Sequence, residues 1–213
     1  MRPVICIITS PDPPPDGERE LIERLAAAAR AGVQLIQIRR PHVDGRVLLR
    51  VTEQAIRAVR GTRTRVLVND RVDVALTAGA HGVHLRADSM SARAVRAIAP
   101  EGFLVGRSVH TAGEAVEAAR QGGLDYLTFG TVFGTTSKPD TQPAGARALH
   151  EACAAVPLPV LAIGGMALSR FGAVARAGAA GFAAIGLFSG AVDEVSRVVR
   201  EASREFDTPE GVS

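Results

Sequence analysis

Tryptophan is absent from this chain of 213 residues, tyrosine occurs once, and cysteine occurs twice. Cys6 and Cys153 lie far apart, each in an apolar stretch, which favours two buried thiols over a disulfide. The sequence has no CxxC pair, and its five histidines lack the spacing of zinc ligands. We therefore expect neither a disulfide nor a structural metal.

Long hydrophobic runs are also missing. No apolar run reaches the roughly 20 residues that a membrane-spanning helix needs. The N-terminus passes from Met1-Arg2-Pro3 directly into a short apolar segment, residues 4–9, without the hydrophobic region of a signal peptide. The sequence thus predicts a cytoplasmic protein that does not bind membranes.

Aromatic residues make up only 4% of the chain, and the formal net charge is +3. The arginines are scattered along the sequence instead of clustered. Nucleic-acid-binding proteins typically carry a basic stripe, often with stacking aromatics. The composition therefore disfavours a nucleic-acid partner and favours a small anionic substrate.

Lysine is the scarcest charged residue. Lysine and arginine together number 25, and Lys138 is the only lysine among them. It lies in the segment 134–139, Gly-Thr-Thr-Ser-Lys-Pro. A compact ammonium suits one phosphate oxygen or a leaving diphosphate, whereas arginine presents a planar fork. One lysine can survive by chance, but the neighbouring glycine and hydroxyls favour an anion site.

Short apolar runs alternate with helical patterns from end to end. The runs are followed by polar residues or glycine, as expected of parallel strands buried on both faces. Between them, residues 17–31 and 44–60 repeat apolar side chains at helical spacing, and Ser91 and Thr111 are predicted N-caps. The expected strands are 4–9, 33–39, 65–69, 82–85, 103–107, 126–130, 160–163 and 181–185.

Eight such units in 213 residues predict an α/β fold, a (β/α)8 TIM barrel. We expect a single domain over residues 1–213, with a polar tail from about residue 207. A doubly wound sheet is the alternative, although eight units are more than it usually needs. A barrel of this size can also form a homo-oligomer through its helical shell.

The active site of a barrel lies just after the carboxyl ends of its strands. Many residues at these expected positions are polar or are glycines, and their joint placement predicts one functional rim. The candidates are Gln37, Arg39, Asn69, Asp70, Arg107, Ser108, His110, Thr135, Ser137, Lys138, Gly164, Gly165, Ile185 and Gly186.

Two features of this rim indicate chemistry on a phosphorylated compound. Gly164-Gly165 and Gly186 follow the last two strands, where backbone N–H groups often hold phosphate, although they also suit simple tight turns. His110 is a candidate proton shuttle because imidazole titrates near neutrality. Its alternative is a loop histidine bonded to backbone.

Three charged residues on the rim have more than one interpretation. Asp70 is a candidate Mg²⁺ ligand or an N-cap for the helix that begins near Arg71. Arg39 and Arg107 are candidates for clamping a phosphate or carboxylate, or for surface ion pairs. His84 lies within an expected strand and is assigned a structural role in the interior.

These motifs together resemble the thiamine phosphate synthase superfamily, in order and over about residues 4–195. The resemblance implies a (β/α)8 barrel. One branch, thiamine phosphate synthase, joins hydroxymethylpyrimidine diphosphate to thiazole phosphate and expels diphosphate, using Mg²⁺. The other, thiazole tautomerase, moves a proton within a carboxythiazole phosphate and needs no metal. The matching runs are 37–39, 68–75, 82–85, 106–111, 129–133, 135–138 and 162–166.

The resemblance also implies roles for the rim residues. Gly164, Gly165, Ile185 and Gly186 would hold the thiazole phosphate. Lining the pyrimidine diphosphate side would be Gln37, Arg39, Asn69, Asp70, Ser108 and Lys138.

This chain departs from the synthase pattern in two loops. Pro41 stands where a second lysine is expected. Ser89 stands where the synthase has an acidic Mg²⁺ ligand, and Asp88 precedes it by one residue. A missing carboxylate weakens metal neutralisation of a leaving diphosphate.

We therefore expect a thiazole tautomerase in which His110 shuttles the proton and Lys138 assists. Thiamine phosphate synthase is the alternative if Asp88 replaces the missing ligand. A non-catalytic regulator that binds thiazole phosphate or thiamine phosphate is the third possibility.

Overall fold

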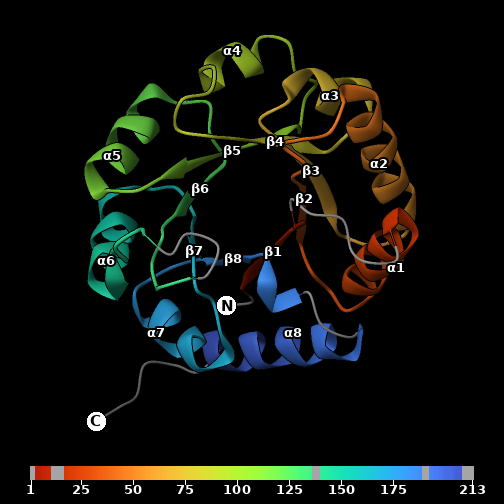
Figure 1. The fold of residues 1–213 in the computed structure, drawn as a ribbon. Coiled ribbons are helices and arrows are strands. Elements are labelled where there is room, and N and C mark those ends of the chain that lie inside the picture. The colour runs from red at the N-terminus through yellow and green to blue at the C-terminus, as the bar shows by residue number, and fades with distance from the viewer. Residues whose placement is uncertain (1–2, 11–16, 136–139, 189–191, 208–213) are drawn as a thin grey trace.

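The computed structural model describes residues 3–10, 17–135, 140–188 and 192–207. Within these residues, eight parallel strands close into a barrel in the order of the chain (Figure 1). The last strand pairs with the first through Val4 and Gly181. This arrangement confirms the predicted (β/α)8 barrel. The strands are β1 (Val4–Ile8), β2 (Leu35–Ile38), β3 (Arg65–Asn69), β4 (Gly82–Leu85), β5 (Leu104–Val109), β6 (Tyr126–Phe129), β7 (Val160–Ile163) and β8 (Gly181–Ala184).

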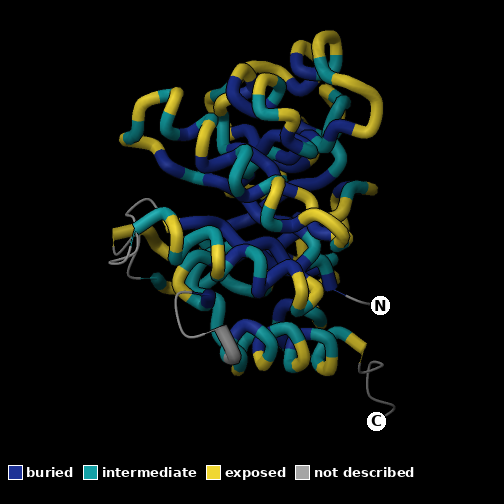
Figure 2. The backbone as a smooth tube through the Cα atoms, turned by 90° about the vertical axis from the view of Figure 1, so that its right-hand side faces the viewer, coloured by how far each residue is buried: buried dark blue, intermediate teal, exposed yellow. Residues whose placement is uncertain are grey.

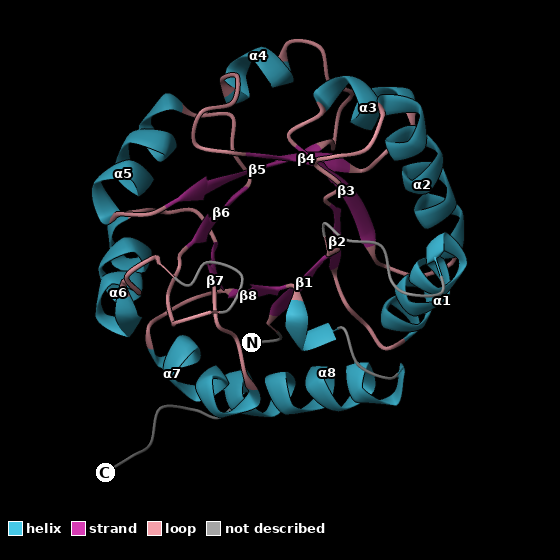
Figure 3. Ribbon diagram, viewed as in Figure 1, coloured by secondary structure: helices cyan, strands magenta, loops and turns pink. Residues whose placement is uncertain are grey.

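Helices surround the barrel as an outer ring (Figure 3). Two short 3-10 turns, η1 (Leu168–Arg170) and η2 (Gly186–Phe188), follow β7 and β8. The α-helices in the described residues are α1 (Gly17–Arg30), α2 (Gly45–Ala58), α3 (Val72–Thr77), α4 (Ala92–Arg96), α5 (Ala112–Gln121), α6 (Gly145–Ala155), α7 (Phe171–Arg176) and α8 (Val192–Asp207). The polar tail expected beyond residue 207 lies outside the described residues.

Local sequence signals account for where several helices begin. Ser91 Oγ accepts a hydrogen bond from the backbone N–H of Ala94 at 3.2 Å, so it caps α4. Thr111 Oγ1 accepts one from the N–H of Glu114 at 3.1 Å and caps α5. Both predicted N-caps are confirmed.

The strands separate two hydrophobic layers. Their outward side chains, such as Ile36 and Ile38, pack against the helices. Their inward side chains, such as Leu35 and Leu67, fill the barrel. Figure 2 shows the barrel strands as the most buried part of the chain.

Both cysteines are free thiols; Cys6 is buried as expected, whereas Cys153 is only partly buried. Cys6 is fully buried in the barrel interior, and burial raises its pKa to about 12. No helix in the described ranges is both long enough and apolar enough to cross a bilayer.

Candidate functional site

A cavity of about 490 Å³ opens at the carboxyl ends of β5, β6, β7 and β8. It gathers residues that lie up to 79 positions apart, since Ser108 and Leu187 both line it. The fold therefore brings several of the predicted site residues together at this end of the barrel. The predicted site residues in its wall are Ser108, His110, Thr135, Gly164, Gly165, Ile185 and Gly186.

The other predicted residues are placed differently. Gln37 lies in β2 and Arg39 follows that strand, while Asn69 ends β3 and Asp70 follows it. None of the four lines this cavity. Arg107 belongs to β5 but does not line the cavity. Ser137 and Lys138 lie outside the described residues.

His110 is held at the cavity wall by its own backbone and by its ring. Its backbone N–H donates to Glu114 Oε2 at 2.8 Å. Its ring Nδ1 bonds to the carbonyl oxygen of Gly130. A carbonyl only accepts, so Nδ1 carries a proton and the neutral ring has Nε2 as its acceptor atom. The ring can therefore receive a proton or a donated hydrogen bond from a ligand, while its other nitrogen is fixed to backbone.

Gly164 and Gly165 allow the chain after β7 to pack against the segment after β6. Both have positive φ, 102° and 61°. A Cβ at Gly164 would lie 2.6 Å from Thr131 Cγ2, and a Cβ at Gly165 would overlap the carbonyl oxygen of Gly134. Only glycine fits such positions without strain. The tight turn is thus confirmed, and phosphate binding by these N–H groups stays a prediction.

Arg170 is a cavity residue that the sequence reasoning missed. Its guanidinium donates to the carbonyl oxygen of Gly165 and lies over the Phe133 ring, 4.8 Å from the ring centroid. It therefore brings a fixed positive charge to the cavity wall. The sequence signal that could have identified Arg170 is its position five residues after Gly165, at the end of η1.

A buried polar network lies beneath the cavity. His84 Nδ1 is 2.9 Å from the hydroxyl of Tyr126, and its Nε2 is 2.9 Å from Ser108 Oγ. Ser108 Oγ is also 3.1 Å from Thr128 Oγ1. Burial, with a smaller effect of the Arg107 charge, lowers the pKa of His84 to about 4. The expected interior role of His84 is confirmed: it positions Ser108 at the cavity floor.

The carboxyl end of β2 carries two polar side chains with unmet hydrogen-bonding capacity. Gln37 is only 2% exposed, and its Nε2 donates to Asn69 Oδ1 at 2.8 Å. Its Oε1 is buried and has no partner among the described residues. Arg40 is 8% exposed, and its Nε and one Nη are likewise buried without a partner within the described chain. Such groups are costly unless a ligand completes them.

Asp70 is not the N-cap of α3. That position belongs to Arg71, whose side chain makes no capping bond, so the capping alternative is wrong. Asp70 has a positive φ of 64° and lies between Asn69, which ends β3, and Arg71, which precedes α3. One of its carboxylate oxygens accepts a hydrogen bond from Ser89 Oγ, and the other lies 3.5 Å from Arg86 Nε.

Magnesium does not fit these residues as they are arranged. The carboxylate of Asp88 is held by Arg86, with distances of 3.0 and 2.8 Å. Both candidate acids are therefore occupied by other groups. In the described part of the chain, no three acidic, histidine or cysteine side chains are grouped as a metal would require.

Arg107 holds the same loop from the neighbouring strand. Its guanidinium donates to the carbonyl oxygens of Ala87 and Met90 at 3.0 and 2.6 Å. Burial lowers its pKa, and the nearby charge of Asp70 opposes that effect. The side chain thus positions the loop, and its predicted contact with substrate stays a prediction.

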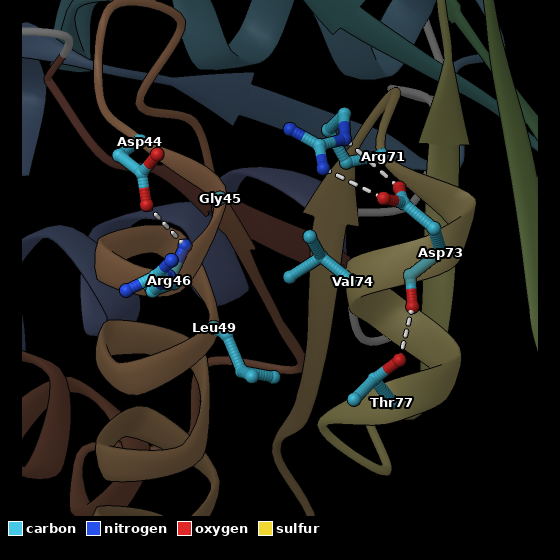
Figure 4. Close-up of a pocket in the computed structure, with 8 residues that line it drawn as sticks. All are labelled: Asp44, Gly45, Arg46, Leu49, Arg71, Asp73, Val74 and Thr77. Atoms are coloured by element: carbon cyan, nitrogen blue, oxygen red, sulfur yellow. Dashed lines mark hydrogen bonds and ion pairs between the residues drawn. The ribbon is translucent and has the colours of Figure 1, made fainter.

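A second cavity, of about 310 Å³, lies outside the barrel between α2 and α3 (Figure 4). Two of its charged groups pair with each other: Arg71 bonds to Asp73 at 2.8 and 2.6 Å. Asp44 accepts from the backbone N–H of Arg46 at 2.8 Å. None of the predicted substrate-binding residues lines it, so the barrel mouth remains the candidate site.

Comparisons with known proteins agree with this geometry. A family model described as thiamine monophosphate synthase matches residues 5–188. The thiamine-phosphate synthase of Roseiflexus castenholzii is 42% identical over 193 residues, which cover 90% of this chain and 83% of that protein. The thiamine-phosphate synthase of Methanoculleus marisnigri is 42% identical over 173 residues, 81% of each chain.

A solved structure is similar over nearly the whole length. The thiamine phosphate pyrophosphorylase from Pyrococcus furiosus superposes with a TM-score of 0.81 at 30% identity. The match covers 97% of this chain and 96% of that one. The resemblance to the superfamily that the motifs indicated is therefore confirmed.

Proposed function

This chain belongs to the thiamine monophosphate synthase family, and on that premise we propose that it is a thiamine-phosphate synthase. It would join hydroxymethylpyrimidine diphosphate to thiazole phosphate and release diphosphate. The relatives described above carry synthase or pyrophosphorylase names at 30–42% identity over most of the chain. They favour this alternative over the tautomerase that the loop motifs suggested.

One structural observation carries the choice. A tautomerase binds one ring, whereas a synthase must hold two substrates side by side. The cavity after β5 to β8 suits one phosphorylated ring. In β2, on another part of the same barrel, the buried Gln37 Oε1 has no partner among the described residues and can accept a hydrogen bond from an amine of a second ligand.

The thiazole phosphate occupies the cavity in this proposal. Its phosphate lies at Gly164 and Gly165, whose positive φ values turn the backbone close to the wall. Arg170 contributes positive charge from the adjoining turn. The ring then extends towards His110, and the barrel interior below it is closed by the bonded pair of Ser108 and His84.

His110 has a different role in a synthase from the one expected in a tautomerase. A neutral ring nitrogen of the thiazole forms its new bond to carbon without transferring a proton. His110 Nε2 is therefore a hydrogen-bond partner of the substrates, held in place through Nδ1 and Gly130. A tautomerase, in contrast, depends on a proton shuttle, which typically contributes about 10²–10⁴ in rate.

The family implies Mg²⁺, which would neutralise the leaving diphosphate. The arrangement around Asp70 and Ser89 does not supply a ready set of ligands for it. The proposed roles of His110, Arg170 and the paired glycines do not depend on the metal.

The test is an assay with both substrates present, supplied with and without Mg²⁺, and followed by release of thiamine phosphate. We expect steady turnover to thiamine phosphate. His110→Gln, which keeps a polar side chain, should lower the rate by no more than about tenfold, because no proton shuttle is lost. His150→Gln is the matched control, since His150 is exposed on α6.

A parallel assay supplies the unaromatised carboxythiazole phosphate alone and follows ring absorbance. Faster isomerisation than in buffer, without any thiamine phosphate in the first assay, contradicts the proposal and supports the tautomerase. The same pattern with His110→Gln inactive would identify His110 as the shuttle.

A further inference from the structure

Arg86 lies between two carboxylates on the rim, at the start of the loop after β4. Its guanidinium makes two hydrogen bonds to Asp88, at 3.0 and 2.8 Å. The same group faces Asp70, with 3.5 Å from Nε to the nearer carboxylate oxygen. The backbone N–H of Arg86 donates to Ser89 Oγ at 2.8 Å, and Ser89 in turn donates to Asp70. One arginine thus links both acids of this loop.

The charges of this cluster cancel. Asp70 and Asp88 carry two negative charges, and Arg86 and Arg107 carry two positive ones; Arg107 is fixed to the same loop through Ala87. A divalent cation needs hard oxygen ligands with surplus negative charge. Here the surplus is zero, and a guanidinium already lies between the carboxylates.

A second observation, at the end of β2, two strands away from β4, points to an anion. Arg40 follows β2 by two residues and is 8% exposed. Its Nε and one Nη are buried and have no partner among the described residues. Buried guanidinium N–H groups without acceptors are unfavourable, and an anionic ligand with several oxygens would supply the missing acceptors. Arginine is well suited to such a ligand because it donates two parallel hydrogen bonds.

We infer that this rim binds the diphosphate of its substrate through arginine side chains, with Arg86 in the place of a divalent cation. The inference rests on the proposed synthase function and adds the charge-neutralising residue. Arg86 exchanges part of its contact with Asp88 for phosphate oxygens, and Arg40 approaches from the side of β2. Binding of the diphosphate group then needs no divalent metal.

Inorganic pyrophosphate is the probe that tests this inference. Its binding to the full chain is measured by titration calorimetry with EDTA present. We expect saturable binding in EDTA, and Arg86→Gln should weaken it by about ten- to a hundredfold, the effect of one lost charged hydrogen-bonding group. Arg86→Lys keeps the charge without the fork and should recover part of the affinity. Arg120→Gln is the control, because Arg120 is an exposed arginine on α5 that pairs with Glu117.

A second titration uses Mn²⁺ alone and follows its paramagnetic resonance signal. The wild-type chain should leave the Mn²⁺ free, and Arg86→Gln should bind it more tightly because the two carboxylates are released. Circular dichroism confirms that each variant is folded.

Two results would overturn the inference: pyrophosphate binding only when Mg²⁺ or Mn²⁺ is added, or equal affinity in the wild type and Arg86→Gln. Turnover to thiamine phosphate is measured on the same samples. If the chain forms thiamine phosphate but binds pyrophosphate only with a metal, the role of Arg86 is refuted and the synthase function is not. Absence of turnover with every metal refutes the synthase, while the Mn²⁺ titration still reports whether Arg86 occupies the cation position.

Discussion

Acid should destabilise this barrel through His84, and the structure sets the size of the effect. The ring is fully buried between the hydroxyls of Tyr126 and Ser108. Burial lowers its pKa from 6.5 to about 4 in the folded chain. In the unfolded chain the ring is in water and titrates near its ordinary value.

The direction of this pH effect on stability follows from proton binding. Between the two pKa values the unfolded chain binds a proton that the folded chain does not, so acid favours unfolding. The contribution of neutral His84 is complete above pH 6.5 and is lost as the pH falls towards about 4. Each pH unit in that window costs about 1.4 kcal/mol, which amounts to about 3 kcal/mol over the whole window.

Urea unfolding of the wild type and of His84→Gln, near pH 7 and near pH 5, measures this term. The substitution lowers stability at both pH values, but it removes the titrating group. We expect the wild type to lose about 2 kcal/mol more than the variant between the two pH values.

His81→Gln provides the comparison. His81 is half-buried, and burial followed by the charge of Arg65 lowers its pKa as well. Its removal should change the pH dependence in the same direction by a smaller amount. Stability curves that run parallel for the wild type and His84→Gln would refute the reasoning.

Two further substitutions test the contacts around the cavity. Gly165→Ala should lower the melting temperature and weaken binding of thiazole phosphate, because its Cβ would overlap the carbonyl oxygen of Gly134. The control is Gly61→Ala, at φ 78° with nothing within 4 Å of its Cβ, which should cost only about 1 kcal/mol of backbone strain. Equal effects of the two substitutions would show that the close approach at Gly165 is unimportant. Tyr126→Phe leaves His84 Nδ1 without its hydroxyl partner in the barrel interior. The substitution should therefore reduce the free energy of unfolding by about 1–3 kcal/mol in urea titrations. Unchanged stability would contradict the hydrogen-bond network around His84.

The alternation of short apolar runs and helical patterns was sufficient to predict the barrel, because buried parallel strands leave a clear signal. Strand ends were less predictable. β5 was expected to end at Arg107 but continues to Val109. It does so because Ser108 faces inward to His84, while Val109 pairs with Phe129 of β6. Neither partner is adjacent in sequence.

The candidate site was predictable where glycines and polar residues follow strands directly. The contacts of Arg86 and Arg170 were not, since both arginines reach across loops to groups that only the fold brings near. The choice between the synthase and the tautomerase was also hard to make from the sequence. It rested on Ser89 and its neighbours, whereas similarity to the synthases extends over most of the chain.

Steady-state rates with each substrate varied in turn test the central claim most directly: that two separate regions of one rim hold the two substrates. Arg170→Gln should raise KM for thiazole phosphate, and Gln37→Met should raise KM for pyrimidine diphosphate, each by about tenfold with the other KM nearly unchanged. Absence of thiamine phosphate, or variants that raise both KM values together, would contradict the account.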